Sequence, residues 1–206
     1  MRNATVPPLI AARGKRLLRD AYLRDFRSRR AAIHNASSWK LERRQHFEEQ
    51  ESPSREAFRR GDWGLALRLL DAKRDSILRT LRQDRDNNSV LHRVRVVESP
   101  LTPYLQWELH SLRLQAELGK PIRVVTAEAV NPFETSGMLP EVVVLGSQVL
   151  YEVIYTEMGV PNGAIRFTDP DLVRCWEAFI QDLYHDGEDV VAYVDRRIAP
   201  LPPPQM

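Results

Sequence analysis

The chain has 206 residues, of which 43% are hydrophobic and 28% are charged, a composition typical of a globular domain. Its single cysteine, Cys175, excludes an internal disulfide framework and fits a reducing compartment. No segment approaches the roughly 20 apolar residues of a membrane-spanning helix, and the N-terminus lacks the apolar core of a secretory signal, so we expect a cytoplasmic protein.

The net charge of +2 conceals an asymmetry along the chain. Residues 1–44 contain 12 Lys and Arg against three acidic residues, a net charge of +9, whereas the rest of the chain contains 18 against 25, a net charge of −7. A basic arm on an acidic body suggests that the arm binds a polyanion, a membrane surface or an acidic partner. The alternative is that the arm folds back onto its own acidic body.

The first predicted element is a helix over residues 9–34 that is rich in arginine nearly all round. Its apolar stripe consists of Leu17, Leu18, Ala21, Tyr22, Leu23 and Phe26. The sequence "HNASS" at residues 34–38 ends this pattern. Residues 1–36 are therefore interpreted as a basic helical arm.

Residues 37–88 are interpreted as a helical region that packs on the core. Its beginning, residues 39–51, fits a strand and a helix equally well. A helix then begins at Pro53 with Ser52 as its N-cap, because proline suits the first helical position. A further amphipathic helix is predicted from Trp63 to about Arg85, and the turn-forming residues "DRDNNS" end it.

Residues 89–197 are interpreted as a mixed α/β core domain. The sequence "LHRVRVVES" alternates in the manner of a strand with one buried face, which carries Val94 and Val96, and Arg93 and Arg95 lie on its other face. A helix capped by Thr102 and a second strand follow, and strand–helix–strand is the unit that pairs strands in parallel.

Two further strands, separated by Gly146 and Ser147, are predicted to form an antiparallel hairpin, and a short strand follows at "AIRFT". A strong helix begins after Asp169, and we expect Cys175 to be a buried structural thiol within it. A further short helix precedes a proline-rich tail, residues 198–206, which is either solvated or docks as a polyproline helix. The expected fold class is α+β: a helical N-terminal third followed by a small mixed β-sheet flanked by helices.

No complete catalytic or metal-binding motif is present. The five histidines form no H-E-x-x-H or H-x-K arrangement, and the chain has no G-x-S-x-G elbow, S-x-x-K motif or glycine-rich phosphate loop. We therefore expect no metal and no cofactor. A basic cluster with aromatic neighbours remains as a candidate contact for a polyanion, and non-specific nucleic acid is one such partner. The candidate residues are Arg27, Arg29, Arg30, Arg43 and Arg44.

The segment "VRVVESPLTPYLQWELHSLRLQAELGKPIRVV" resembles an actinobacterial family of domains of unknown function with the pattern RVRVVSEPLTDYLRFE. The matching positions are Arg93, Val94, Arg95, Val96, Val97, Pro100, Leu101, Tyr104, Glu108, Gly119, Ile122 and Arg123. Lys120 stands where these proteins often carry an acid. Later and earlier segments also match, so the resemblance covers about residues 38–186.

This resemblance implies a regulatory accessory role, because such proteins are commonly encoded beside small acidic proteins and XRE-type helix-turn-helix regulators. The order of elements also resembles one half of a phospholipase-D-like fold, and the lack of H-x-K-x-x-x-x-D implies a catalytically empty version. We expect a non-enzymatic regulatory or interaction protein that acts with a helix-turn-helix regulator or a small acidic protein and that has no membrane partner. Sensing a small ligand is one such regulatory role.

The alternative is an enzyme of an unrecognised type with a carboxylate and tyrosine pocket at the strand ends. Pockets favour the carboxyl ends of parallel strands, which is where the first strand of the core domain meets its helix. The candidate residues for a ligand pocket or such an active site are Glu98, Tyr104, Glu108 and Arg123.

Overall fold

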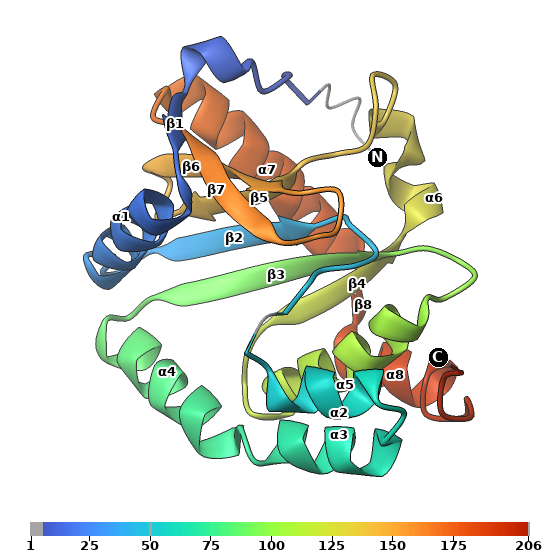
Figure 1. The fold of residues 1–206 in the computed structure, drawn as a ribbon. Helices are drawn as coiled ribbons and strands as arrows, with labels where there is room; N and C mark the ends of the chain where they lie inside the picture. The colour runs from blue at the N-terminus through green and yellow to red at the C-terminus, as the bar shows by residue number, and fades with distance from the viewer. Residues whose placement is uncertain (1–5, 50, 206) are drawn as a thin grey trace.

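The structure is a computed structural model that describes residues 6–49 and 51–205 (Figure 1). Its strands form one mixed sheet in the order β1-β7-β6-β5-β2-β3-β4-β8. The strands are β1 (Lys15–Leu17), β2 (Ser37–Glu42), β3 (Val90–Val97), β4 (Ile122–Thr126), β5 (Glu141–Leu145), β6 (Val149–Tyr155), β7 (Pro161–Phe167) and β8 (Glu188–Asp189). The α+β architecture predicted from the sequence is confirmed.

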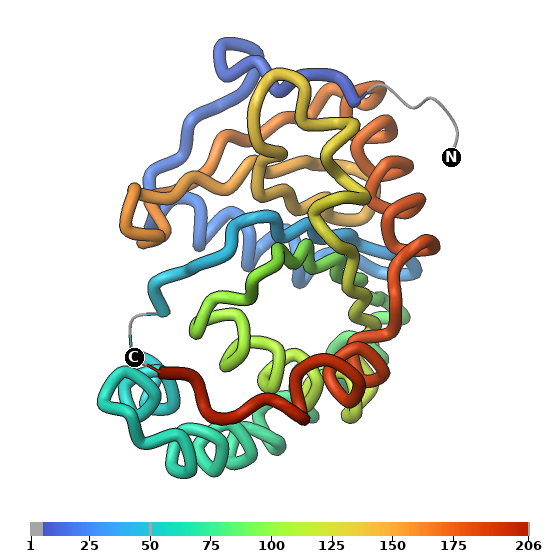
Figure 2. Tube along the Cα trace, turned by 90° about the vertical axis from the view of Figure 1, so that its right-hand side faces the viewer, coloured from blue at the N-terminus to red at the C-terminus, as the bar shows by residue number. Residues whose placement is uncertain are grey.

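The helices lie on both faces of this sheet, as Figures 1 and 2 show. They are α1 (Arg19–Ala31), α2 (Pro53–Arg59), α3 (Trp63–Asp71), α4 (Arg74–Asp86), α5 (Pro103–Glu117), α6 (Ala127–Val130), α7 (Pro170–Asp186) and α8 (Val190–Arg197), with short 3-10 helices at Ala11–Arg13 and Asn131–Phe133. Among the residues that the structure describes, no helix combines the length and the apolar character that crossing a membrane requires.

Side-chain caps set the start of several helices where the sequence predicts them. The side chains of Ser52, Asp62 and Thr102 each accept a hydrogen bond from a backbone amide three residues further on. The Asp169 carboxylate caps α7 in the same way, and proline occupies the first position of α2, α5 and α7. These local signals explain why α2, α3, α5 and α7 begin where the sequence predicts.

Strands β2, β3 and β4 are parallel neighbours, whereas β5 pairs with β2 in the antiparallel direction. The connection from β2 to β3 contains α2, α3 and α4, and the connection from β3 to β4 contains α5. Strands β5, β6 and β7 form an antiparallel meander that continues the sheet. The predicted parallel crossover and the predicted hairpin are both present.

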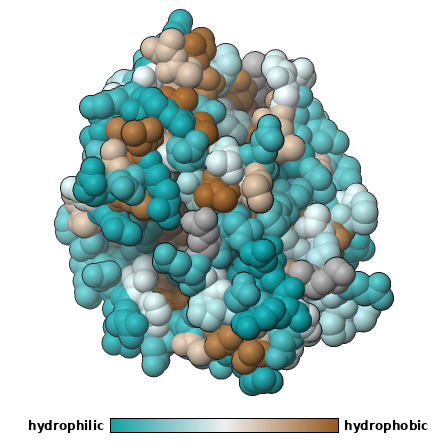
Figure 3. All heavy atoms as spheres, in the orientation of Figure 1, coloured by the Kyte–Doolittle hydropathy of each residue, from teal (hydrophilic) through white to brown (hydrophobic). Residues whose placement is uncertain are grey.

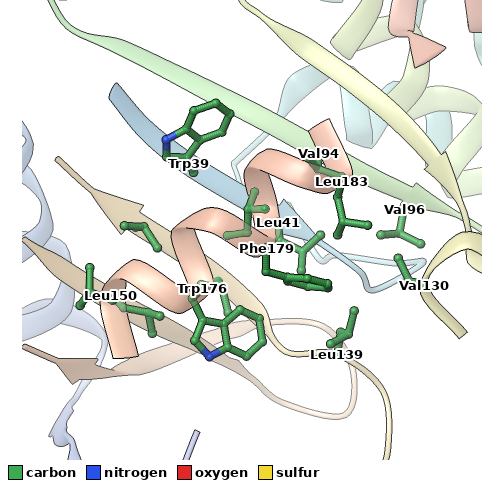
Figure 4. Packing of buried hydrophobic residues seen from close by; sticks show 14 of the residues in the cluster. Trp39, Leu41, Val94, Val96, Val130, Leu139, Leu150, Trp176, Phe179 and Leu183 are labelled. Atoms are coloured by element: carbon green, nitrogen blue, oxygen red, sulfur yellow. The ribbon is translucent and has the colours of Figure 1, made fainter. Parts of the chain in front are cut away.

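One face of the sheet is apolar and is covered by α7 (Figure 4). Leu41 of β2 and Val94 of β3 are completely buried there, against Trp176 and Phe179 of α7. Alternation along β2 and β3 places these side chains on one face, and α7 supplies a complementary stripe. This face is the main hydrophobic core.

The opposite face has two apolar ends with a charged region between them. Helix α1 packs on the β5–β6–β7 end through Tyr22 and Phe26, and α5 and α8 pack on the β4 end. The proline-rich tail lies against α5, where the amide of Gln106 donates to the carbonyl oxygen of Pro202 at 2.7 Å. The central part of this face, on β2, β3 and β5, carries ionisable side chains.

The N-terminal part differs from the predicted long helix. Residues 15–17 form β1, which pairs with β7, and the helix begins only at Arg19. Leu17 is buried against this neighbouring strand, so the backbone extends to meet it. Within the region interpreted as helical, residues 37–42 form β2 at the centre of the sheet. The sheet therefore draws strands from both sides of the boundary at residue 89.

Three smaller differences have clear physical reasons. The predicted helix from Trp63 to Arg85 is two helices, because α3 ends at Asp71 and the chain turns before α4 begins. Cys175 is exposed, since it lies on the outer side of α7 while its neighbour Trp176 faces the sheet. Arg95, expected on a solvent-facing side of its strand, is completely buried because α5 supplies a carboxylate partner above it.

Candidate functional site

A groove with a volume of about 620 Å³ lies on the charged face of the sheet, between α1 and α4. Figure 1 shows these two helices on either side of the amino-terminal halves of β2 and β3. In the same orientation, Figure 3 shows a largely hydrophilic surface on which hydrophobic residues gather in separate groups. We refer to this cavity as the α1–α4 groove.

The floor of the groove comes from side chains on alternate positions of β2 and β3. Lys40 and Arg93 are direct neighbours in the parallel register, and both line the groove. Because successive strand residues point to opposite faces, Lys40 and Arg93 lie on the face away from α7. The same alternation places Glu42 and Arg95 beside each other one step further along the strands.

Glu42 neutralises part of this positive charge. One carboxylate oxygen lies 2.5 Å from the Lys40 ammonium, and the other lies 3.6 Å from Nε of Arg93. Burial by itself raises the pKa of Glu42, but the charges of Arg93, Lys40 and Arg95 outweigh it and lower the pKa to about 2. Glu42 is therefore ionised at neutral pH, and its single negative charge lies between the positive charges of Lys40 and Arg93.

Lys120 adds a further cation at the turn between α5 and β4. Its ammonium donates to the side-chain oxygen of Gln115 at 3.3 Å, and among the described residues it makes no ion pair. Burial lowers the pKa of Lys120 to about 8, and repulsion from Arg93, Arg30 and Lys40 acts in the same direction. The side chains around Lys120 thus leave its positive charge unbalanced.

The walls of the groove are partly apolar. Tyr22, Leu23 and Phe26 line it from α1, and Leu81 lines it from α4. Burial raises the pKa of Tyr22 to about 12, so its hydroxyl is neutral at physiological pH. An ion pair joins the two walls, because Arg30 donates to both carboxylate oxygens of Asp84 at 2.8 Å.

Glu141 closes one side of the groove from β5. One oxygen of its carboxyl group accepts hydrogen bonds from the backbone amides of Arg43 and Arg44, at 2.8 and 2.5 Å. The other oxygen is buried without a hydrogen-bond partner among the described residues. Burial raises the pKa of Glu141 to about 7, with a contribution from the negative charge of Glu42. This carboxyl group is therefore partly protonated at neutral pH.

A separate charged cluster lies deeper on the same face and is sealed from solvent. Nε and a terminal nitrogen of Arg95 lie 2.9 and 2.8 Å from one carboxylate oxygen of Glu108. The guanidinium also donates to the carbonyl oxygens of Glu42 and Val96, and lies over the ring of Phe47. Burial opposes the charge of Arg95, but Glu108 and other acidic groups raise its pKa. The arrangement is that of a buried structural ion pair.

The structure does not gather the four predicted pocket residues at one site. Tyr104 and Glu108 lie one turn apart on α5, both buried, and the Tyr104 hydroxyl donates to Glu49 at 3.2 Å. Glu98 forms an ion pair with Arg43. It also lines a second cavity of about 480 Å³ at the carboxyl ends of β3 and β4.

The fourth of these residues, Arg123, lies on the opposite face of the sheet. Its guanidinium is 5.6 Å from the centre of the Tyr184 ring and donates to the carbonyl oxygen of Gly187 at 3.4 Å. None of the four residues lines the α1–α4 groove.

The five predicted polyanion contacts also separate into different environments. Arg43 is buried and paired with Glu98 and Glu134, so we no longer assign it to a polyanion surface. Arg27 is exposed on α1. The other three are engaged by neighbouring groups: Arg29 pairs with Asp25, Arg30 pairs with Asp84, and Arg44 lies over the ring of Tyr155.

Sequence patterns single out some residues that line the groove, such as Tyr22, Arg30 and Lys120, but place none of them in a shared cavity. Alternating charges in "WKLE" and "HRVRV" were the available signal for Lys40 and Arg93, but no pattern indicates that the charged side is enclosed. Lys120 stands out in the sequence only as an unexpected basic residue after Gly119. Glu141 and the walls from α1 and α4 depend on contacts between segments far apart in the chain, which local patterns do not report.

Within residues 6–49 and 51–205, no group of three or more histidine, cysteine, aspartate or glutamate side chains has a geometry that could hold a metal ion. No curated protein matches this chain. The family described as "Domain of unknown function (DUF6879)" matches residues 24–195, which confirms the expected membership of a domain-of-unknown-function family. The chain therefore belongs to the DUF6879 family.

Proposed function

We propose that this protein is a non-enzymatic regulatory protein of the cytoplasm that binds a small ligand in the α1–α4 groove and acts with a helix-turn-helix transcriptional regulator. The observation that carries the proposal is the groove itself: a cavity of ligand size with apolar walls and a cationic floor. The helix-turn-helix partner follows from the family resemblance of the sequence.

The enzymatic alternative, a carboxylate and tyrosine pocket, has weaker support. Glu108 is held by Arg95 in a buried ion pair, and Tyr104 is bonded to Glu49 and buried. A general acid or base needs to reach a substrate within hydrogen-bond distance. Neither Tyr104 nor Glu108 lines the α1–α4 groove, so neither reaches a ligand bound there.

Helix α1 connects the proposed ligand site to the proposed surface for the partner. Its inner side contributes Tyr22 and Phe26 to the groove, whereas Arg24 and Arg27 are exposed on its outer side. A ligand that contacts α1 and α4 together favours the arrangement of these helices that fits it best. In our proposal the outer basic side of α1 then meets an acidic surface of the partner.

The proposal is tested by mixing the purified chain with a candidate helix-turn-helix regulator and measuring the complex by analytical ultracentrifugation. We expect a stoichiometric complex that the double substitution Arg24→Glu and Arg27→Glu weakens by about tenfold or more, because it reverses two interfacial charges. The matched control is Arg79→Glu with Arg82→Glu on the exposed side of α4. Equal weakening by both double variants, or no complex for the unaltered chain, contradicts the proposal.

A further inference from the structure

We infer that the α1–α4 groove binds a small amphiphilic anion, that is, a phosphate or carboxylate group attached to an apolar body. This inference rests on the proposed function, since it names the chemical class of the ligand sensed there. Three features of the groove carry it: an excess of cations, an apolar region beside them, and a buried carboxyl oxygen that lacks a partner.

The excess of positive charge follows from counting the ion pairs. Arg30 is matched by Asp84 through two short hydrogen bonds. Lys40 and Arg93 share the single carboxylate of Glu42, and the Arg93 contact is the longer of the two, at 3.6 Å against 2.5 Å. Lys120 forms no ion pair among the described residues. A bound anion near Lys120 and Arg93 supplies the missing negative charge, and partial burial strengthens its attraction.

The repulsion among these cations points in the same direction. The charged groups that act on Lys120 are Arg93, Arg30 and Lys40, opposed by Asp84 alone. An empty groove in which partly buried cations repel one another is less stable than one in which an anion lies between them. Because Lys40 and Arg93 come from neighbouring strands, the anion site has a rigid floor.

The apolar part of the groove fits the body of such a ligand. Leu81 lines the groove from α4 and Tyr22 and Phe26 line it from α1, and Val143 and Val153 of the sheet line it as well. The volume of about 620 Å³ lies within the range of roughly 300–1,000 Å³ that is typical of sites for small organic molecules. A bare inorganic anion would leave these apolar walls without a contact, so the ligand carries an apolar body.

Glu141 provides the third feature. This residue lines the groove, and one of its carboxyl oxygens is buried and lacks a hydrogen-bond partner among the described residues. A buried polar atom without a partner is unfavourable, and a protonated carboxyl group removes the penalty by donating to an anion. A phosphate or carboxylate oxygen of the ligand is such an acceptor for the protonated form of Glu141.

The inference is tested by isothermal titration calorimetry of the full chain with three probes: 1-naphthyl phosphate, inorganic phosphate and 1-naphthol. These probes separate the whole amphiphile from its anionic part and from its apolar body. We expect 1-naphthyl phosphate to bind at least about tenfold more tightly than either of the other two, because only this probe uses both parts of the groove. Comparable binding of inorganic phosphate or of 1-naphthol overturns the inference.

Substitutions at Lys120 locate the site. We expect Lys120→Gln to weaken 1-naphthyl phosphate binding by about tenfold, Lys120→Arg to keep it within about threefold, and the exposed control Lys15→Gln to leave it unchanged. Circular dichroism establishes that each variant is folded. If Lys120→Gln binds as tightly as the unaltered chain, the anion site is elsewhere and the inference is wrong.

The same samples separate this inference from the proposed function. A chain that forms the complex with the regulator but does not bind 1-naphthyl phosphate contradicts only the ligand chemistry. A chain that binds 1-naphthyl phosphate through Lys120 but forms no complex contradicts only the regulatory role.

Discussion

The two faces of β2 and β3 are built from alternate residues of the same strands, yet they are stabilised in different ways. On the face covered by α7, Leu41 and Val94 are completely buried among other apolar side chains. On the other face, Glu42 and Arg95 are almost as well buried, but each depends on a charged partner. The apolar face needs only close packing, whereas the charged face needs specific partners at specific distances.

This difference explains why the charged face can hold both a sealed ion pair and a groove. Where α5 covers the strands, Arg95 and Glu108 neutralise each other. Towards the amino ends of the strands, the cations Lys40, Arg93 and Lys120 line the groove, and Glu117 at the end of α5 pairs with Arg113 and is not part of the groove lining. The same face therefore carries a buried ion pair under α5 and an open groove a few residues away.

The largest effect on stability is expected for Arg95→Met, which removes the buried cation at the centre of the charged face. The substitution removes the guanidinium and leaves the Glu108 carboxylate buried without its partner. We expect the free energy of unfolding to fall by about 3–5 kcal/mol, measured by urea denaturation.

The double variant Arg95→Met with Glu108→Leu tests whether the loss comes from the unpaired carboxylate of Glu108. Replacing both charges with apolar groups should recover most of the loss, because no unpaired charge remains buried. If Arg95→Met alone lowers the free energy of unfolding by less than about 1 kcal/mol, the ion pair is not a structural requirement.

A pH-dependent effect of intermediate size is expected from Glu141, also on the charged face. The folded state raises the pKa of this carboxyl group from 4.5 to about 7, so the folded protein keeps the proton while the unfolded chain loses it. The stability that the protonated Glu141 contributes is fully present below pH 4.5 and is lost as the pH rises to about 7. The loss amounts to about 3 kcal/mol.

Glu141→Gln should remove this contribution, because an amide does not titrate. We expect the difference between the variant and the unaltered chain to change in favour of the variant from pH 4.5 to pH 7, in parallel urea titrations. Glu42 titrates in both proteins, so its contribution largely cancels in this difference. A difference that is constant with pH would mean that Glu141 titrates normally.

A smaller effect is expected for Val94→Ala, at the position next to Arg95 but on the apolar face. The side chain is completely buried under α7, so the substitution loses apolar burial and leaves a small cavity. We expect a loss of about 2 kcal/mol, independent of pH and of salt. A salt-dependent loss would indicate that the two faces are not independent.

The comparison of the two faces also shows what the sequence reveals. Strands β3, β4, β5, β6 and β7 and helices α5 and α7 follow from alternation, caps and prolines, which act over a few residues. The sheet position of β1 and β2 does not follow, because it depends on β7, β3 and β5, which are far away in the chain. Alternation identifies two faces of a strand but does not say whether the charged one meets water or a helix.

The candidate site is harder to predict for the same reason. Tyr104 and Glu108 were selected because they follow a parallel strand, and they lie at that junction, but buried. The α1–α4 groove is assembled from α1, α4 and four or more strands, so its existence depends on the complete tertiary structure. Local patterns mark single residues such as Arg30, Arg93 and Lys120 but do not show that they share one cavity.

The smallest effect is expected for Cys175→Ser, on the side of α7 that faces away from the apolar core. Cys175 is exposed, whereas the adjacent Trp176 is buried against the sheet, so the helix separates the two environments within one residue. An exposed thiol makes few packing contacts, and we expect the substitution to change the free energy of unfolding by less than about 0.5 kcal/mol. The thiol should also react with one equivalent of a disulfide reagent such as DTNB under native conditions, because access and not unfolding limits the reaction. If the reaction requires denaturant, α7 is rotated from the orientation described and Cys175 lies within the core after all. That result would also place Trp176 outside the core, and the apolar face would lose one of its largest buried side chains.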